Sequence, residues 1–148
     1  MRSRRERIDT PLAALIDTGA FFALTDQGDT HHRDASAILE DLARGGTRLF
    51  TTNLVLAETH ALLVARLRRA DTAFQFLTDI YGSDSASIIR VTERDEQRAL
   101  EILARSRDKL YSFTDVTSFV VMERLGITRA FSFDRNFAQY GFTLLTAD

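Results

Sequence analysis

Short apolar runs alternate along the chain with longer segments whose apolar positions recur every three or four residues. Apolar runs bounded by turn residues are typical of buried strands, and they predict strands at 12–16, 48–52, 87–91, 129–133 and 142–145. The helical spacing predicts helices at about 20–24, 34–44, 54–67, 71–81, 96–106 and 114–125. Because strands and helices alternate throughout, we predict a three-layer α/β/α fold with a central, mostly parallel sheet.

Polar residues mark the points where several of these helices begin. Asn53 is predicted to cap the helix that follows the second strand. Thr92 and Asp95 have the spacing of a capping box, in which two residues satisfy free N–H groups at a helix start. Ser112 and Asp115 repeat that spacing at the predicted start of a later helix.

Length and composition indicate one globular domain. The chain has 148 residues, 45% of them hydrophobic and 27% charged, and a single domain is predicted over 12–148. The absence of cysteine excludes disulfides and zinc–thiolate sites. The net charge is −2, yet residues 1–7 carry four arginines, so residues 1–11 are predicted to form a flexible basic arm and the remainder is clearly acidic.

No segment has the pattern of an export signal or of a membrane span. The apolar run at 12–16 is shorter than the core of a signal peptide. No run approaches the roughly 18 apolar residues of a transmembrane helix. A cytoplasmic protein without membrane contact is therefore expected.

Three carboxylates stand near strand ends or helix starts. Asp17 and Asp134 each follow a predicted strand, and the carboxyl ends of strands are where open α/β sheets bind ligands. Asp115 lies near a helix start with Ser118 and Phe119 as its helical neighbours, so its carboxylate need not face water. For each of these residues the alternative is an ordinary turn or capping role.

Glu58 has the strongest local argument for a functional role. Its neighbours at helical spacing are Leu54, Ala61, Leu62 and Ala65, which predict that its carboxylate lies within a buried apolar stripe. An unpaired buried carboxylate costs several kcal/mol, so a site is favoured. The alternatives are an ion pair with an arginine or an outward-turned side chain.

Four carboxylates gathered at one edge of a sheet would require a cation. Two unit charges 4 Å apart repel by about 4 kcal/mol at an effective dielectric constant of 20. Oxygen ligands without cysteine favour a hard divalent ion, Mg²⁺ or Mn²⁺. Such an ion beside an open position is suited to phosphoryl chemistry, because it polarises a phosphate and activates water.

At this point the chain resembles a known family. The segments that carry the resemblance are LIDTGAFFAL at 15–24, TTNLVLAET at 51–59, FTDVTSF at 113–119 and AFSFDRNF at 130–137. In their order and spacing these four motifs are similar to those of PIN-domain nucleases, and among these to the VapC-like ribonuclease toxins of toxin–antitoxin pairs. The resemblance covers about residues 15–145.

The resemblance implies a Mg²⁺- or Mn²⁺-dependent endoribonuclease in which a metal-activated water attacks an RNA phosphodiester in line. It implies Asp17 and Asp115 as principal metal ligands, Glu58 as a ligand or a partner of metal-bound water, and Asp134 as a more variable fourth acid. Thr18 and Ser118 fall where family members often have pocket-lining hydroxyl groups. A cognate antitoxin would be the protein partner, and 5′-phosphate ends are expected on the products.

Other functions fit the residues less well. A phospho-acceptor receiver domain needs a paired acid after the first strand, and a haloacid-dehalogenase-like phosphatase needs Asp-x-Asp there; Asp17 has neither pattern. A PIN-like module that binds RNA or assembles with partners without catalysis remains the alternative.

Further surfaces carry weaker expectations. The N-terminal arginines and Arg66, Arg68 and Arg69 are candidates for contacts with the RNA backbone. His31 and His32 are predicted to be solvated in a polar loop, and most aromatic residues to belong to the core and not to a base-stacking platform. The apolar surplus of the helices at 54–67 and 74–80 suggests a homodimer face or an antitoxin groove.

Overall fold

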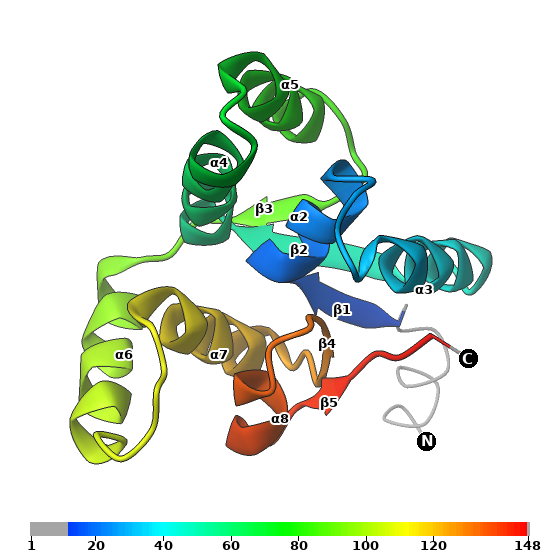
Figure 1. Ribbon diagram of the computed structural model, residues 1–148. Coiled ribbons are helices and arrows are strands. Elements are labelled where there is room, and N and C mark those ends of the chain that lie inside the picture. Colours follow the sequence, from blue (N-terminus) through cyan, green and yellow to red (C-terminus); the bar gives the residue numbers. More distant parts are fainter. Residues whose placement is uncertain (1–11, 148) are drawn as a thin grey trace.

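The predicted parallel α/β sheet is present in the computed structural model, which describes residues 12–147. The basic arm predicted at 1–11 lies outside the described residues. All strand pairs are parallel, and the strand order is β3-β2-β1-β4-β5 (Figure 1). The strands are β1 (Ala13–Ile16), β2 (Arg48–Thr52), β3 (Ser87–Ile89), β4 (Arg129–Phe131) and β5 (Thr143–Leu144).

Helices cover both faces of this sheet, as expected for parallel strands (Figure 1). One hydrophobic cluster joins one face to α2 (Thr18–Thr25), α3 (His32–Arg44), α4 (Asn53–Leu67) and α5 (Ala70–Tyr81). A second cluster joins the other face to α6 (Glu93–Arg105), α7 (Phe113–Leu125) and α8 (Asn136–Tyr140). The three-layer prediction is therefore confirmed.

Successive residues of the central strands point into different clusters. Leu15 and Ala130 belong to the cluster with α6 and α7, whereas Ile16 and Phe131 belong to the cluster with α2 to α5. Because both faces of the sheet are buried, these strands have apolar residues at consecutive positions and show no alternation with polar ones.

Three strands are clearly shorter than the sequence pattern predicts, among them β5, which spans Thr143–Leu144 and not 142–145. β3 ends at Ile89 and β4 at Phe131, two residues before the predicted ends at 91 and 133. After β4 the Ser132 hydroxyl accepts a hydrogen bond from the Asp134 N–H, at 3.0 Å, and so turns the chain away from the sheet. The apolar Phe133 extends the hydrophobic run without extending the strand pairing.

Helix starts follow the predicted polar residues with one correction. Both capping boxes, at Thr92 and at Ser112, are formed as predicted. The prediction for Asn53 is wrong, since the Thr52 hydroxyl accepts from the Val55 N–H and caps α4. Asn53 instead accepts a hydrogen bond from the Val91 N–H and so ties α4 to the segment after β3.

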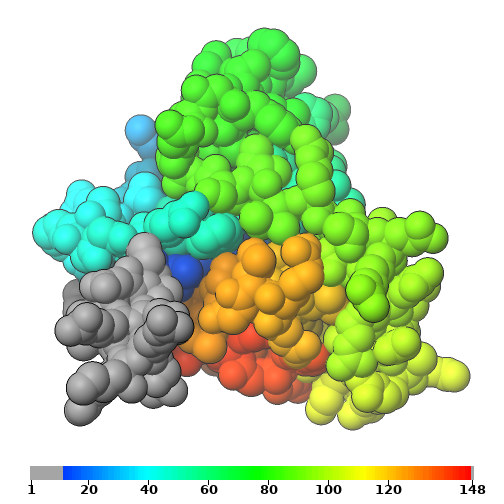
Figure 2. All heavy atoms as spheres, turned by 180° about the vertical axis from the view of Figure 1, so that it is seen from behind, coloured from blue at the N-terminus to red at the C-terminus, as the bar shows by residue number. Residues whose placement is uncertain are grey.

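The segment containing α5 forms one end of the molecule. Seen from behind, the green segment lies at the top of the molecule, and the orange and red segments lie lower (Figure 2). Within the part of the chain that the structure describes, no helix is long and apolar enough to cross a membrane.

Candidate active site

The candidate site lies at the carboxyl ends of β1 and β4, where the strand order of the sheet changes direction. From β1 the chain continues to β2 on one side, and β4 later pairs with β1 on the other side. Asp17 follows β1, and Ser132 follows β4, so both leave neighbouring strands at their carboxyl ends. Such a switch point is the usual ligand site of an open α/β sheet.

Asp17 is buried at the start of α2, with only 4% of its surface exposed. Its Oδ2 accepts a hydrogen bond of 3.1 Å from the Ser132 hydroxyl. The pKa of the Asp17 carboxyl is raised to about 7, chiefly by burial. The Asp115 and Glu58 carboxylates contribute to the rise, and hydrogen bonds to the Thr18 N–H and the Ser132 hydroxyl oppose it. The structure therefore holds a carboxylate that is costly to ionise without a nearby positive charge.

Asp115 is held at the start of α7 by its own capping box. Its Oδ2 accepts from the Ser112 N–H at 3.0 Å and from the Asn136 side-chain amide at 3.1 Å. The carboxyl is buried, and burial together with the Asp134 charge raises its pKa in spite of these hydrogen bonds. Asp115 therefore caps α7 and also belongs to the acidic group, by which we mean the candidate site carboxylates Asp17, Glu58, Asp115 and Asp134.

Asp134 is half-buried and is linked to both other aspartates through shared neighbours. Its N–H donates to Ser132, which in turn donates to Asp17. Its Oδ1 accepts from the Asn136 N–H at 2.9 Å, and the Asn136 side chain reaches Asp115. Ser132 and Asn136 thus connect the three aspartates, and the sequence analysis gave neither a role.

A signal for these two residues was present but weak. Ser132 and Asn136 flank Asp134 at two-residue spacing, which is typical of local turn hydrogen bonds. Their second contacts, to Asp17 and Asp115, cross 115 and 21 residues of sequence respectively. No local pattern predicts contacts of that range.

Glu58 corrects one expectation. It is exposed, so the prediction of a carboxylate within a buried stripe is wrong. The buried side of α4 consists of Val55, Leu56, Thr59 and Leu63, whereas Ala61 and Ala65 beside Glu58 are exposed. Because α4 is apolar around most of its circumference, periodicity does not distinguish its packed face. The Glu58 charge nevertheless lies close enough to Asp17 to raise its pKa.

The predicted hydroxyl residues have an unusual environment. Thr18 and Ser118 are buried, and each has a hydroxyl oxygen without a hydrogen-bond partner. The only other such buried side-chain atom among residues 12–147 is Asp17 Oδ1. Unsatisfied buried oxygens cost stability and require an explanation. A bound hard cation would explain them, since these oxygen atoms are suitable ligands for Mg²⁺ or Mn²⁺.

The side chains of the four candidate acids do not by themselves form a metal-binding site in this structure. Within the described part of the chain, no group of three or more histidine, aspartate or glutamate side chains is close enough to hold a metal ion. Like charges repel at short distance, which favours carboxylates that stand apart. The assignment of Asp17, Glu58, Asp115 and Asp134 as metal ligands therefore stays a prediction.

Among the basic residues proposed to contact RNA, Arg66 lies in the last turn of α4 and Arg68 and Arg69 follow that helix, whereas the N-terminal arginines lie outside the described residues. Arg66 follows Glu58 by eight residues, or about 12 Å along a helix. Its guanidinium lies 5.3 Å from the centre of the Phe22 ring. Arg68 ends the helix in the left-handed conformation, with φ of 56°. Their contact with RNA stays a prediction.

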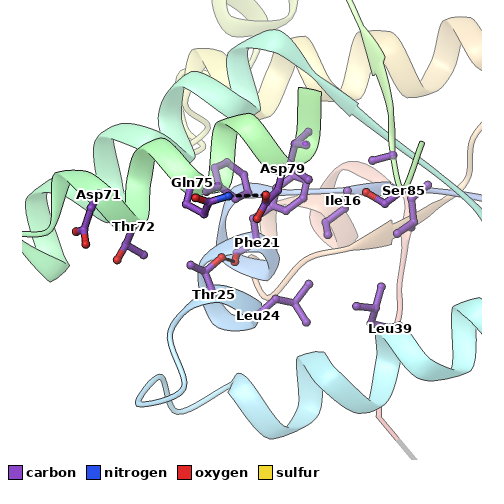
Figure 3. A pocket seen from close by; sticks show the side chains of 14 residues that line it. Ile16, Phe21, Leu24, Thr25, Leu39, Asp71, Thr72, Gln75, Asp79 and Ser85 are labelled. Carbon is purple, nitrogen blue, oxygen red and sulfur yellow. Dashed lines mark hydrogen bonds between the residues drawn. The ribbon is translucent and has the colours of Figure 1, made fainter. Parts of the chain in front are cut away.

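None of the four candidate site acids lines the cavity beside α5. It has a volume of about 640 Å³ and lies between α2, α3 and α5 (Figure 3). Phe21, Leu24 and Leu39 contribute apolar side chains, while Asp71 and Asp79 contribute acidic ones. It is an open, mostly apolar groove with acidic residues on its α5 side.

Comparison with known proteins places the chain among characterised relatives. The PIN domain family model matches residues 14–143. A VapC ribonuclease of Archaeoglobus fulgidus is 40% identical over 129 residues, which cover 86% of this chain and 80% of the relative. The 23S rRNA-specific endonuclease VapC20 of Mycobacterium tuberculosis is 37% identical over 128 residues, which cover 86% and 93%.

Solved structures show the same fold. The crystal structure of M. tuberculosis VapC20, described as a sarcin-ricin loop cleaving toxin, has a TM-score of 0.81 at 33% identity, covering 90% of this chain and 98% of that one. A VapBC2 structure from Rickettsia felis, bound to a promoter DNA fragment, has a TM-score of 0.69 at 15% identity, covering 93% and 100%.

Proposed function

This chain belongs to the PIN domain family, and from that premise we propose that it is a metal-dependent endoribonuclease acting as the toxin of a toxin–antitoxin pair. The observation that carries the proposal is that the buried side-chain oxygens without a hydrogen-bond partner among residues 12–147 belong to Asp17, Thr18 and Ser118, all of them predicted site residues, and that two further carboxylates raise the pKa of Asp17. The relatives named as ribonucleases support the choice of RNA as substrate. Since that substrate is cytoplasmic, we place the protein in the cytoplasm.

We assign the cation-binding role to Asp17, Asp115, Glu58 and Asp134. Bound there, Mg²⁺ or Mn²⁺ would lower the pKa of an attacking water and offset phosphate charge. Ser132 fixes the Asp17 carboxylate, and Asn136 fixes that of Asp115, so both are pre-oriented for the ion and the scissile phosphate. Glu58 on α4 adds the charge of an exposed carboxylate that raises the pKa of Asp17.

An RNA cleavage assay tests this proposal. Wild-type protein is expected to cleave single-stranded RNA with Mg²⁺ or Mn²⁺, to stop with EDTA, and to leave 5′-phosphate and 3′-hydroxyl ends. Asp17→Asn should remove the activity, whereas Asp95→Asn, a matched change at a buried aspartate outside the site, should retain it. Cyclic 2′,3′-phosphate products, or cleavage unaffected by EDTA and by Asp17→Asn, would refute the mechanism. RNA binding without cleavage would favour the non-catalytic alternative.

We further propose that the groove between α2, α3 and α5 receives the antitoxin. Its apolar lining and acidic α5 side fit a segment with apolar side chains and one or more basic residues. Leu39→Asp in this groove should abolish co-purification with the antitoxin. Leu125→Asp, at a leucine of similar exposure outside the groove, is the control, with exposed fractions of 36% and 40%. Equal capture by both variants would argue against this groove.

The predicted homodimer face stays a prediction. The helices expected to form it do carry exposed apolar side chains, at Val64 on α4 and at Phe74 and Tyr81 on α5. Phe74 is exposed because the buried residues of α5 are Ala73 and Phe76.

A further inference from the structure

Two rings that are distant in sequence stack beside the acidic group. His31, between α2 and α3, lies on Phe133 with 4.3 Å between ring centres and an angle of 11° between the rings. His31 is exposed, whereas Phe133 is half-buried against the hydrophobic cluster below it. His31 is therefore exposed in a loop, as predicted, but its ring also stacks on Phe133.

Phe133 ties this stacked pair to the site. It lies between Ser132, which donates to Asp17, and Asp134, which belongs to the acidic group. The hydrogen bonds of Ser132 and Asn136 hold the loop on both sides of Phe133. The ring pair thus stands on a fixed loop within one residue of a candidate metal ligand.

His31 is held from its own side as well. Its N–H donates to Asp29 Oδ1 at 2.8 Å, and its carbonyl accepts from the Ala35 N–H at the start of α3. The neighbouring His32 donates from its ring Nδ1 to the Ala23 carbonyl, at 2.7 Å, and so anchors the loop to α2. An exposed ring is therefore positioned from both neighbouring helices.

We propose that His31 is a nucleobase-stacking residue, on which an unpaired base of the RNA next to the scissile phosphate stacks in continuation of Phe133. This inference rests on the proposed ribonuclease function and adds a binding subsite to it. One face of the His31 ring is covered by Phe133, and the exposed residue offers the other face to a ligand. Every base has a flat π-face, so the subsite accepts bases by stacking and not by hydrogen-bonded readout.

The charge distribution explains why such a contact is useful here. The folded part of the chain carries an excess of acidic residues, so general attraction for the RNA backbone is weak. Stacking contributes affinity without positive charge and also fixes where a nucleotide lies. A base held on His31 would place its adjoining phosphates beside Asp134.

Steady-state kinetics on single-stranded RNA test the subsite. His31→Ala should raise KM by about 5- to 100-fold, the range expected for loss of one stacked base, with a much smaller change in kcat. His31→Tyr, which keeps a flat ring, should restore KM. Phe74→Ala removes an aromatic ring that is 65% exposed on α5 and should leave KM unchanged.

A binding measurement separates this inference from the proposed chemistry. In the Asp17→Asn background, a short single-stranded RNA carrying 2-aminopurine is titrated with protein, and base stacking is followed as fluorescence quenching. Quenching that is lost in Asp17→Asn/His31→Ala and kept in Asp17→Asn/His31→Tyr supports stacking on His31. This readout does not require cleavage.

Three results would overturn the proposal. One is an unchanged KM in His31→Ala while the wild type cleaves RNA, which leaves the ribonuclease function intact. Another is a KM that rises equally in His31→Ala and His31→Tyr, which indicates a role for the imidazole other than stacking. The third is a fall in the melting temperature of His31→Ala that accounts for the whole kinetic effect.

Discussion

The two capping boxes of this protein have the same local hydrogen bonds but different long-range partners. At Thr92 and Asp95, and again at Ser112 and Asp115, a hydroxyl and a carboxylate satisfy each other's backbone N–H groups. Beyond the cap, Asp95 receives two hydrogen bonds from Arg124, at 3.0 and 2.8 Å. Asp115 instead receives one from the neutral Asn136 and lies near the acids Asp134 and Asp17.

This difference in partners reverses the electrostatic outcome. Burial raises the pKa of both carboxyls, but at Asp95 the hydrogen bonds and charge of Arg124, with those of the cap, lower it below its usual value. At Asp115 the main influences named within residues 12–147 include no cationic side chain, and the pKa is raised. A paired buried carboxylate stabilises the fold, whereas one left without a cation is available to bind one.

Replacing the carboxylate of each capping box by an amide should give the largest difference in RNA cleavage between the two variants. We expect Asp115→Asn to lower kcat/KM for RNA cleavage by at least about a hundredfold, because a site carboxylate loses its charge. Asp95→Asn should leave cleavage close to the wild-type rate. Comparable losses in both variants, measured with the protein folded by circular dichroism, would contradict the functional distinction.

For stability we expect the opposite order, with Asp95→Asn losing more than Asp115→Asn. Asp95→Asn is expected to lower the free energy of unfolding at pH 7 by about 1–3 kcal/mol, a range that allows for the solvent exposure of Arg124. Asp115→Asn should cost less, because no ion pair is lost. Urea unfolding of both variants and the wild type measures the difference.

The pH dependence of stability should reveal the Asp95 pair. Its pKa is lower in the folded than in the unfolded protein, so its stabilisation is present above the unfolded value of about 3.8 and is lost as pH falls below it. The gap in melting temperature between wild type and Asp95→Asn should therefore narrow as pH falls from 5 toward 3. A constant gap would show that the pair does not titrate as described.

A smaller effect is expected from removing the neutral partner of Asp115. Asn136→Ala deletes the side-chain hydrogen bond to Asp115 but keeps the backbone bond to Asp134. We expect cleavage to fall about tenfold, the lower range for loss of a residue that orients a metal ligand. Asn136→Ser offers a shorter polar group, and activity between the two would support positioning. No change in either variant would remove Asn136 from the site.

The cap hydroxyls should show the smallest effects. Thr92→Ala and Ser112→Ala each remove one hydrogen bond at a helix start and should cost about 0.5–2 kcal/mol of stability. Only Ser112→Ala should also slow cleavage, because it loosens the backbone that holds Asp115. Thermal melts and the cleavage assay, run side by side, compare the boxes directly.

Local patterns predicted a large part of this molecule. The alternation of strands and helices and the two capping boxes follow from short runs of apolar and polar residues. Asp17 was singled out because it directly follows β1, whereas β4 ends three residues before Asp134. The hydrogen bonds of the capping boxes join neighbours in the chain, so the sequence carries that information directly.

What the sequence alone determined, then, is the order of its elements and the positions of the carboxylates at their ends. Tertiary structure decided which cap received Arg124 and which received Asn136, turned Glu58 to solvent, and set His31 on Phe133. These outcomes depend on how the helices and strands are positioned against one another when they pack. Packing brings together residues that lie more than a hundred positions apart in the sequence. Two identical local motifs can therefore acquire opposite electrostatic roles.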